Sequence, residues 1–285
     1  MKTKILLFGA FIALSFFVSC SSNGNSPSTT SITGTDAAVV SKIDASINDV
    51  ATIAEDQVTA QQSITAKTSV AFKSLLPICA TVTTVLENGT WTRTIDFGTT
   101  GCALPNGNIL KGKITISFAN DFISSTKTIS YSFDGFYHNG NLIQGNRTIV
   151  QTLSSSTLLT ALHPVSTHTI NMTITFANGT VYTRTGTRVR EMIAGYDTPF
   201  IWSDNIFMET GNSITARPNG DVITATITTP LEFTLSCNMP FPVQGVVSII
   251  KNTSTGVLDY GNGTCDDLAT LTVDGGATTN ITLGK

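Results

Sequence analysis

The chain has 285 residues, only 12% of them charged, and its formal net charge at pH 7 is −3. Charged residues make up about a quarter of an ordinary soluble domain, so this chain has about half the usual share. A mildly acidic chain lacks the basic face that phosphates require, which argues against nucleic acid as a partner. Threonine accounts for 48 residues, and this β-branched polar side chain suits the solvent face of a strand.

The first twenty residues have the pattern of a bacterial lipoprotein signal. Lys2 and Lys4 precede an apolar run at residues 5–17, and Cys20 follows shortly after it. The run is shorter than the ~20 residues that span a bilayer, and its end resembles the lipobox, where the signal is cut before a lipidated cysteine. We therefore predict that residues 1–20 are a signal peptide and that lipid on Cys20 anchors the mature chain to a membrane.

A tether and one helix are predicted to follow. Residues 21–35 are rich in Ser, Thr, Asn and Gly and have almost nothing to bury, which is typical of a flexible linker. Residues 36–66 then repeat apolar side chains at intervals of three and four, at Val40, Ile43, Ile47, Val50 and Ala54. Asp36 is placed to cap this segment, and aspartates occupy its other faces, at Asp44, Asp49 and Asp56. The pattern predicts an amphipathic helix whose apolar stripe packs on its own domain.

Four cysteines remain after Cys20, an even number that favours two disulfides in an oxidising compartment. They lie in two similar segments, each of which consists of a cysteine, a hairpin, an Asp-aromatic-Gly motif and a second cysteine. If this repeat is real, each disulfide closes its own hairpin, which pairs Cys79 with Cys102 and Cys237 with Cys265. A zinc site would need closely spaced thiolates with histidines nearby, so neither a metal nor another cofactor is predicted.

From residue 78 the apolar period falls to two, and glycine-containing turns separate β-branched runs. The predicted strands are 90–97, 110–118, 126–136, 147–153, 168–176, 180–190, 221–229, 246–250, 268–274 and 278–283. Short turns between successive strands favour a mainly β fold, an antiparallel meander that forms a β-sandwich or an open or partly closed twisted sheet. Residues 77–285 are therefore predicted to be a β domain, with the N-terminal helix covering one face or edge.

Several motifs of this domain resemble a group of Bacteroidota lipoproteins to which no activity is assigned. The similarity lies in Cys79, the sequence Thr-Ile-Asp-Phe-Gly-Thr-Thr-Gly-Cys at 94–102, Lys-Gly-Lys-Ile at 111–114 and Asp-Tyr-Gly-Asn-Gly-Thr-Cys at 259–265. In such lipoproteins, surface display is associated with acidic residues directly after the lipidated cysteine. Residues 21–26 contain none, so the resemblance implies an anchor on the periplasmic side of the outer membrane.

Candidate catalytic groups are sparse. We predict that His138, beside an Asn-Gly turn, and His163, before a proline, lie in loops. The spacing of His163 and His168 suits neither a helical nor a strand metal pair. Asp266 and Asp267 are adjacent, and neighbours on a strand point to opposite faces, so no catalytic residue is predicted.

The Asp-aromatic-Gly motifs have two interpretations. Asp96 and Asp259 could each accept a backbone N–H in an Asx turn, with Gly98 and Gly261 at positive φ. The alternative is a cation site formed by Asp259 with the nearby acidic pair and loop carbonyls. We favour the turn, because Asp96 has no acidic companion in its own loop.

An aromatic-rich loop at residues 196–204 is the one candidate ligand-binding site. Its members are Tyr196, Phe200, Trp202 and Asp204. Exposed rings beside carboxylates would suit stacking on a sugar, whereas rings this bulky more often cap the core at a sheet end.

Three functions follow, in order of preference. The first is a non-enzymatic cell-envelope lipoprotein that binds a glycan, a polypeptide or another envelope component. The second is a periplasmic hydrolase with an acidic pair in a cleft, as in glycosidases. The third is an adhesive subunit that pairs with another chain through a sheet edge, and a long uncapped edge strand would favour it.

Overall fold

A computed structural model describes residues 31–66, 74–198 and 201–284, so the predicted signal, Cys20 and Phe200 lie outside the described residues. The elements in chain order are α1 (Gly34–Ala66), β1 (Thr81–Glu87), β2 (Thr90–Asp96), β3 (Cys102–Ala103), β4 (Ile109–Ala119), β5 (Thr126–His138), β6 (Asn141–Ser154), β7 (His163–Thr175), β8 (Val181–Ala194), β9 (Ile206–Ala216), β10 (Val222–Thr234), the 3-10 turn η1 (Leu235–Cys237), β11 (Gln244–Lys251), β12 (Ser254–Asn262), β13 (Leu268–Val273) and β14 (Thr278–Thr282).

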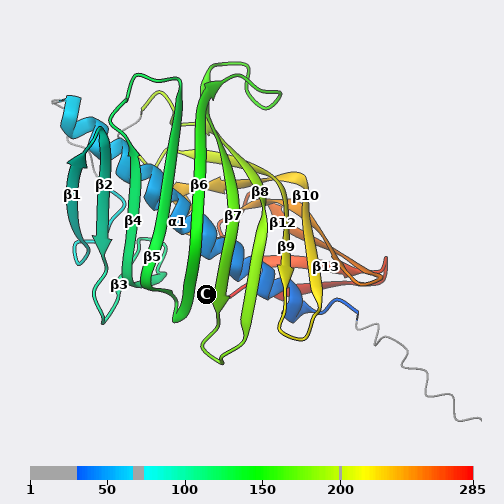
Figure 1. The fold of residues 1–285 in the computed structure, drawn as a ribbon. Coiled ribbons are helices and arrows are strands. Elements are labelled where there is room, and N and C mark those ends of the chain that lie inside the picture. Colours follow the sequence, from blue (N-terminus) through cyan, green and yellow to red (C-terminus); the bar gives the residue numbers. More distant parts are fainter. Residues whose placement is uncertain (1–30, 67–73, 199–200, 285) are drawn as a thin grey trace, which may run out of the picture.

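The strands form one open, antiparallel sheet in which each strand lies beside its neighbours in sequence (Figure 1). The order is β1-β2-β4-β5-β6-β7-β8-β9-β10-β11-β12-β13-β14, with the short β3 paired to β4. The predicted antiparallel meander is confirmed, and its open form is one of the predicted alternatives. Several predicted turns are also in place, since Glu87 faces Thr90 across one two-residue turn and His138 faces Asn141 across another.

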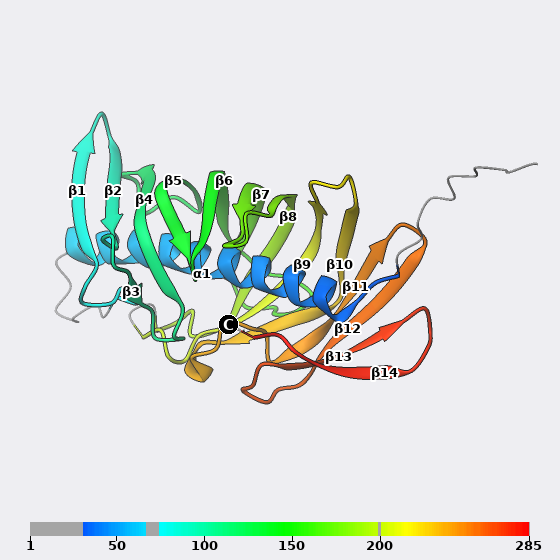
Figure 2. The same cartoon turned by 90° about the horizontal axis from the view of Figure 1, so that it is seen from below.

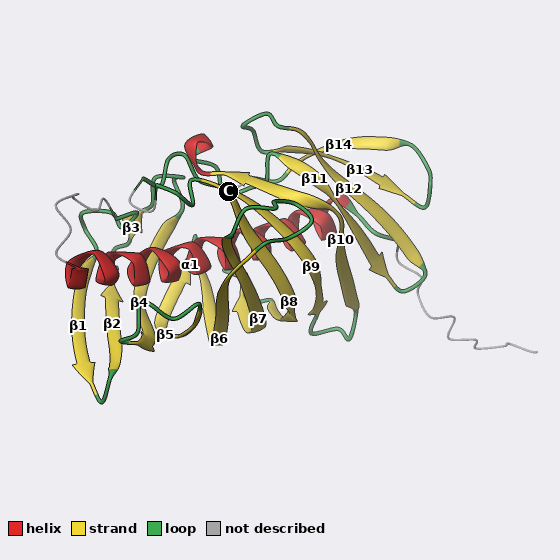
Figure 3. Cartoon of the chain, turned by 90° about the horizontal axis from the view of Figure 1, so that it is seen from above, coloured by secondary structure: helices red, strands yellow, loops and turns green. Residues whose placement is uncertain are grey.

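The sheet curves around α1, which lies inside the curve (Figures 2 and 3). Strands β1–β9 line one side of the helix, and β11–β14 turn round its N-terminal half. Two apolar clusters follow this division. One joins the central and C-terminal part of α1 to the strands from β2 to β8, and the other joins its first turns to the strands from β9 to β13.

Local breaks in the ladder allow the sheet to bend. Gly112 has φ of 79°, and an added Cβ would lie 2.0 Å from the carbonyl oxygen of Gly135, where the β4–β5 register shifts. Pro230 lies inside β10 where the β10–β11 register also shifts, opposite Gly245 with φ of 115°. Bulges of this kind increase the twist and curvature of a strand, and they are where an interior proline is tolerated.

The helix departs from the prediction at its start and on its faces. Thr33 and Asp36 form a reciprocal cap, in which the Thr33 N–H donates to Asp36 (2.9 Å) and the Asp36 N–H donates to Thr33 Oγ1 (3.2 Å). Asp36 is therefore the third helical residue and not the cap itself. The predicted tether also extends too far, because Ile32 is buried and its N–H donates to Ser254.

More important, α1 is not amphipathic, because it is buried on nearly all sides. Its buried residues include Asp36, Asp49 and Asp56 as well as the predicted apolar stripe, and Asp44 is half-buried. The sheet encloses the helix instead of covering one face of it, so the acidic side chains face the sheet and not solvent.

Strand β9 is absent from the predicted strands. Its sequence contains Glu209, Gly211 and Asn212, which interrupt the apolar alternation expected of a strand. Glu209 is nevertheless buried, with Arg188 Nη1 at 3.6 Å from its carboxylate. An ion pair with Arg188 thus takes the place of an apolar contact at that position.

Candidate functional site

Buried charge is the most unusual feature of the interior. Carboxylates of α1 meet cationic side chains that the strands and turns of the sheet direct inward. Three arginines come from β8 alone and share one face of that strand, because they occupy even-numbered positions. The pairs are Asp36 with Arg217 and Lys251, Asp44 with Arg184 and Arg188, and Glu55 with Arg190.

Asp44 is the centre of this network. One oxygen accepts from Arg184 Nη2 and the other from Arg188 Nη2 at 3.4 Å. Arg184 Nη1 also donates to Thr215 Oγ1 at 2.5 Å, and Arg188 Nη2 donates to Ser213 Oγ at 2.9 Å. Burial lowers the pKa of Arg184, although the adjacent Asp44 favours its charged form. The network thus joins the middle of the helix to β8 and β9.

The other acidic groups are similarly enclosed. Burial works against ionisation of Glu55, yet His168, whose Nε2 lies 3.6 Å from the carboxylate, and the charge of Arg190 hold the pKa of Glu55 below the ordinary value. Burial raises the pKa of Asp56 to about 6, while Ser74 Oγ (2.6 Å) and the Leu75 N–H (3.1 Å) donate to its carboxylate. Burial also raises the pKa of Glu209. Shifted carboxyl pKa values occur at active sites, but each of these groups is engaged within the fold: Glu55 with Arg190, Asp56 with Ser74 and Leu75, and Glu209 beside Arg188.

All three histidines lie in strands, so the prediction of loop positions for His138 and His163 is wrong. His138 ends β5 and is 2.8 Å from Asp49, and His163 begins β7 and is 3.0 Å from Glu191. His168 lies within β7 at 3.6 Å from Glu55, and burial lowers its pKa to about 4. Each histidine therefore pairs with a different carboxylate and is buried.

The two cysteine segments have the predicted organisation. Disulfides join Cys79 to Cys102 and Cys237 to Cys265. The β1–β2 hairpin lies between the first pair, and the β11–β12 hairpin lies between the second.

The Asp-aromatic-Gly motifs form the predicted Asx turns. The Gly98 N–H donates to Asp96 Oδ1 at 2.8 Å, and the Gly261 N–H donates to Asp259 Oδ1 at 2.9 Å, with positive φ at both glycines. Asp266 accepts the Leu268 N–H in a turn of its own. Among the described residues, no three His, Cys, Asp or Glu side chains gather closely enough to hold a metal ion.

The described residues of the aromatic loop present little ring surface. Trp202 is 8% exposed and packs with the cluster that includes Phe207 and Phe233. Tyr196 is half-buried, with its ring centroid 6.4 Å from that of His163, and Asp204 is exposed and accepts from Thr198 Oγ1. The described part of this loop therefore offers no flat aromatic platform.

Strand β1, unlike the aromatic loop, is open to solvent along its whole length, because all seven of its residues are exposed. Within the described residues it pairs only with β2, so its outer edge carries free N–H and C=O groups. Val82, Val85 and Leu86 are between 38% and 52% exposed. The strand contains no lysine, proline or bulge, the usual devices that prevent edge pairing.

No family model, curated protein or solved structure matches the chain. Where the structure describes the chain, it contains no helix that is both long and apolar enough to cross a membrane.

Sequence reasoning missed the arginines of β8, although a signal was present. Arg184, Arg188 and Arg190 recur at even spacing among threonines, which places them on one face of a strand opposite the threonine face. Three cations on one face of a central strand predict either a charged surface or a buried acidic partner. The aspartates of α1 are that partner.

Proposed function

We propose that the chain is a non-enzymatic, lipid-anchored subunit of the cell envelope that pairs strand β1 with β1 of a second copy. The observation that carries the proposal is the unprotected β1 edge, exposed on both faces. Pairing through an edge needs no pocket and no catalytic group, which suits a chain whose buried acidic groups already have partners inside the fold.

The hydrogen bonds of the β1–β2 hairpin fix which backbone N–H and C=O groups of β1 point away from β2. Glu87 and Thr90 close a two-residue turn in which Asn88 and Gly89 both have positive φ. Such turns are closed by a hydrogen-bonded pair, so alternate residues back along β1 bond to β2. The N–H and C=O groups of the residues between them, Val82, Thr84 and Leu86, therefore point away from the sheet.

The sequence of β1 favours antiparallel pairing centred on Thr84. In that register Thr84 faces its own copy and Val82 faces Leu86, so that each facing pair can exchange two hydrogen bonds. Apolar and β-branched side chains meet like partners, which stabilises paired strands. Glu87, the one charged residue of the strand, faces Thr81, so the two acidic side chains lie at opposite ends of the interface.

Membrane attachment is the second part of the proposal. It is supported by the lipobox-like sequence that ends at Cys20 and by the absence of acidic residues at 21–26, which favours the periplasmic side of the outer membrane. Two disulfides suit that oxidising compartment.

Cys20→Ser is expected to abolish incorporation of radioactive palmitate and to move the protein from the membrane fraction to the soluble fraction. The physical reason is that the variant lacks the thiol that would carry the proposed lipid. Cell fractionation with parallel palmitate labelling measures both effects. Membrane retention of the unlabelled variant would contradict the anchor.

Thr84→Cys is expected to give a disulfide-linked dimer of the full chain under mild oxidation. Facing residues of an antiparallel pair lie about 5.5 Å apart at Cα, within the range that a disulfide can bridge. Non-reducing electrophoresis measures the product.

Thr81→Cys is the matched control for this register. In the proposed pairing, two Thr81 residues lie six positions apart along the strand, or roughly 20 Å, which is too far for a disulfide. Thr84→Pro tests the edge itself, because it removes an outward N–H without removing a bond to β2, and it should convert the dimer to monomer in sedimentation experiments. Equal crosslinking of both cysteine variants, or a monomeric parent protein, would refute the proposal.

A further inference from the structure

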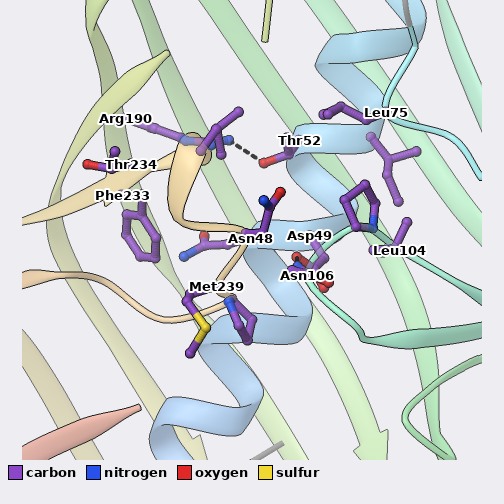
Figure 4. A pocket seen from close by; sticks show the side chains of 15 residues that line it. Asn48, Asp49, Thr52, Leu75, Leu104, Asn106, Arg190, Phe233, Thr234 and Met239 are labelled. Atoms are coloured by element: carbon purple, nitrogen blue, oxygen red, sulfur yellow. Dashed lines mark hydrogen bonds between the residues drawn. The ribbon is translucent and has the colours of Figure 1, made fainter. Parts of the chain in front are cut away.

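Two of the cavities beside α1 differ in how their charged groups are satisfied. The smaller, of about 80 Å³, lies against the middle of the helix (Figure 4). There Arg190 donates to Thr52 Oγ1 at 2.9 Å, and Asp49 accepts from Asn106 and Asn108, so both charged groups already have partners. The larger, of about 280 Å³, is formed by α1, the facing ends of β4 and β5 and the loop between them, and its charged groups are not engaged in this way.

The larger cavity has an apolar wall that belongs to the core. Val58 of α1 and Phe118 of β4 are buried members of the first apolar cluster, and Phe122 of the β4–β5 loop packs against that cluster. The ring centroids of Phe118 and Phe122 are 6.2 Å apart, and the ring planes are tilted by 57°. Because the core holds these side chains, the wall is preformed, as is usual for ligand sites.

Lys127 adds an unused hydrogen-bond donor to this cavity. It occupies the same face of β5 as Ile129 and Tyr131, which follow at alternate positions and are buried, so Lys127 lies on the inward face of the sheet. Burial lowers the pKa of its ammonium group. Within the described residues that group makes neither a hydrogen bond nor an ion pair, although an ammonium can donate three hydrogen bonds.

Asp121 adds an unused acceptor to the same cavity. Its Oδ1 accepts the N–H groups of Ile123 at 3.3 Å and Ser124 at 3.2 Å, which fixes the turn after β4. Its Oδ2 accepts no hydrogen bond from the part of the chain that the structure describes. The charge of Asp121 favours the ammonium form of Lys127, yet no ion pair joins the two side chains. An anion and a cation therefore line one cavity without contacting each other.

We propose that this cavity binds a neutral hexopyranose ring of a glycan, a function separate from strand pairing at β1. Neighbouring ring hydroxyls can serve both charged groups, because one donates to Asp121 Oδ2 while another accepts from Lys127 Nζ. The C–H face of the ring contacts Phe122. The size also fits, because an engineered cavity of roughly 150 Å³ holds benzene, and a hexopyranose has about twice as many non-hydrogen atoms. A carboxylate ligand would be repelled by Asp121, and an amine by Lys127.

The test uses the full chain in micelles of lauryldimethylamine oxide, a detergent without a sugar head group. The probes are the methyl glycosides of glucose, galactose and mannose. Saturation-transfer NMR should show transfer from protein to the ring protons of at least one of them, with a dissociation constant on the order of 1–10 mM for a single ring. Glycerol, which has hydroxyls but no ring face, should show none. No transfer to any of the three glycosides, or tighter binding of anionic methyl glucuronide than of all three, would overturn the proposal.

Two substitutions test the polar contacts with little change in shape. Lys127→Met keeps the aliphatic stem and removes the ammonium, and Asp121→Asn keeps an acceptor for the turn and removes the charge. Each should weaken binding of the glycoside by about tenfold, because a hydrogen bond to a charged group is lost. The control Lys113→Met, at an exposed position of β4 that pairs with Asp96, should leave binding unchanged. Circular dichroism checks that each variant is folded. Undiminished binding by both cavity variants would refute the site, and neither result depends on β1, because dimerisation is measured separately.

Discussion

Asp44→Ala is expected to lower the free energy of unfolding by about 3–5 kcal/mol. The substitution leaves the buried guanidinium group of Arg184 without a carboxylate partner and leaves Arg188 with Glu209 alone, and breaking a buried pair from one side has costs of this size. Alanine is the better helix former, so the helix itself gains slightly and the loss is attributable to the ion pairs. Urea unfolding followed by circular dichroism measures the change.

Asp134→Ala provides the matched control. Asp134 is exposed on β5, and no ion pair involves it within the described residues. Surface changes of this kind usually shift stability by less than about 0.5 kcal/mol. If Asp44→Ala were as stable as this control, the buried charge network would have no structural role.

Trp202→Ala should lower the free energy of unfolding by about 3–5 kcal/mol, the range found for removal of a large buried ring. Trp202 is 8% exposed and belongs to the apolar cluster that joins β9 and β10 to the start of α1. The same variant should keep whatever glycan binding the parent shows, because the ring is not displayed. Thermal unfolding and a glycan array on the same preparations measure the two effects.

Ile201→Ala is the control for this loop, because Ile201 is 50% exposed and should change stability by less than about 1 kcal/mol. A Trp202→Ala protein that keeps its melting temperature and loses a glycan would restore the aromatic loop as a binding site.

The hairpins were predictable because their signals are local. Asn88-Gly89 and Asn139-Gly140 require positive φ, which few other residue pairs supply, and each turn fixes the register of its two strands. The disulfide pairing followed from the same hairpins. The meander order was predictable for the same reason, because a short connection places two consecutive strands side by side and antiparallel.

The interior of the sheet was not predictable in the same way. Asp44 and Arg184 are 140 residues apart, and nothing near either residue indicates the other. The acidic positions of α1 therefore resembled a solvated face. The β1 edge is likewise a property of topology, since its sequence resembles that of any half-buried strand.

The enclosed helix also has a consequence for the order of folding. The N-terminal segment is synthesised first, yet Asp36 meets Arg217 only after a further 181 residues, and Glu55 meets Arg190 after 135. Until then these acidic side chains lack their cationic partners. The helix can therefore complete its ion pairs only after most of the meander is available, so the segment that is synthesised first is among the last to have its charges neutralised.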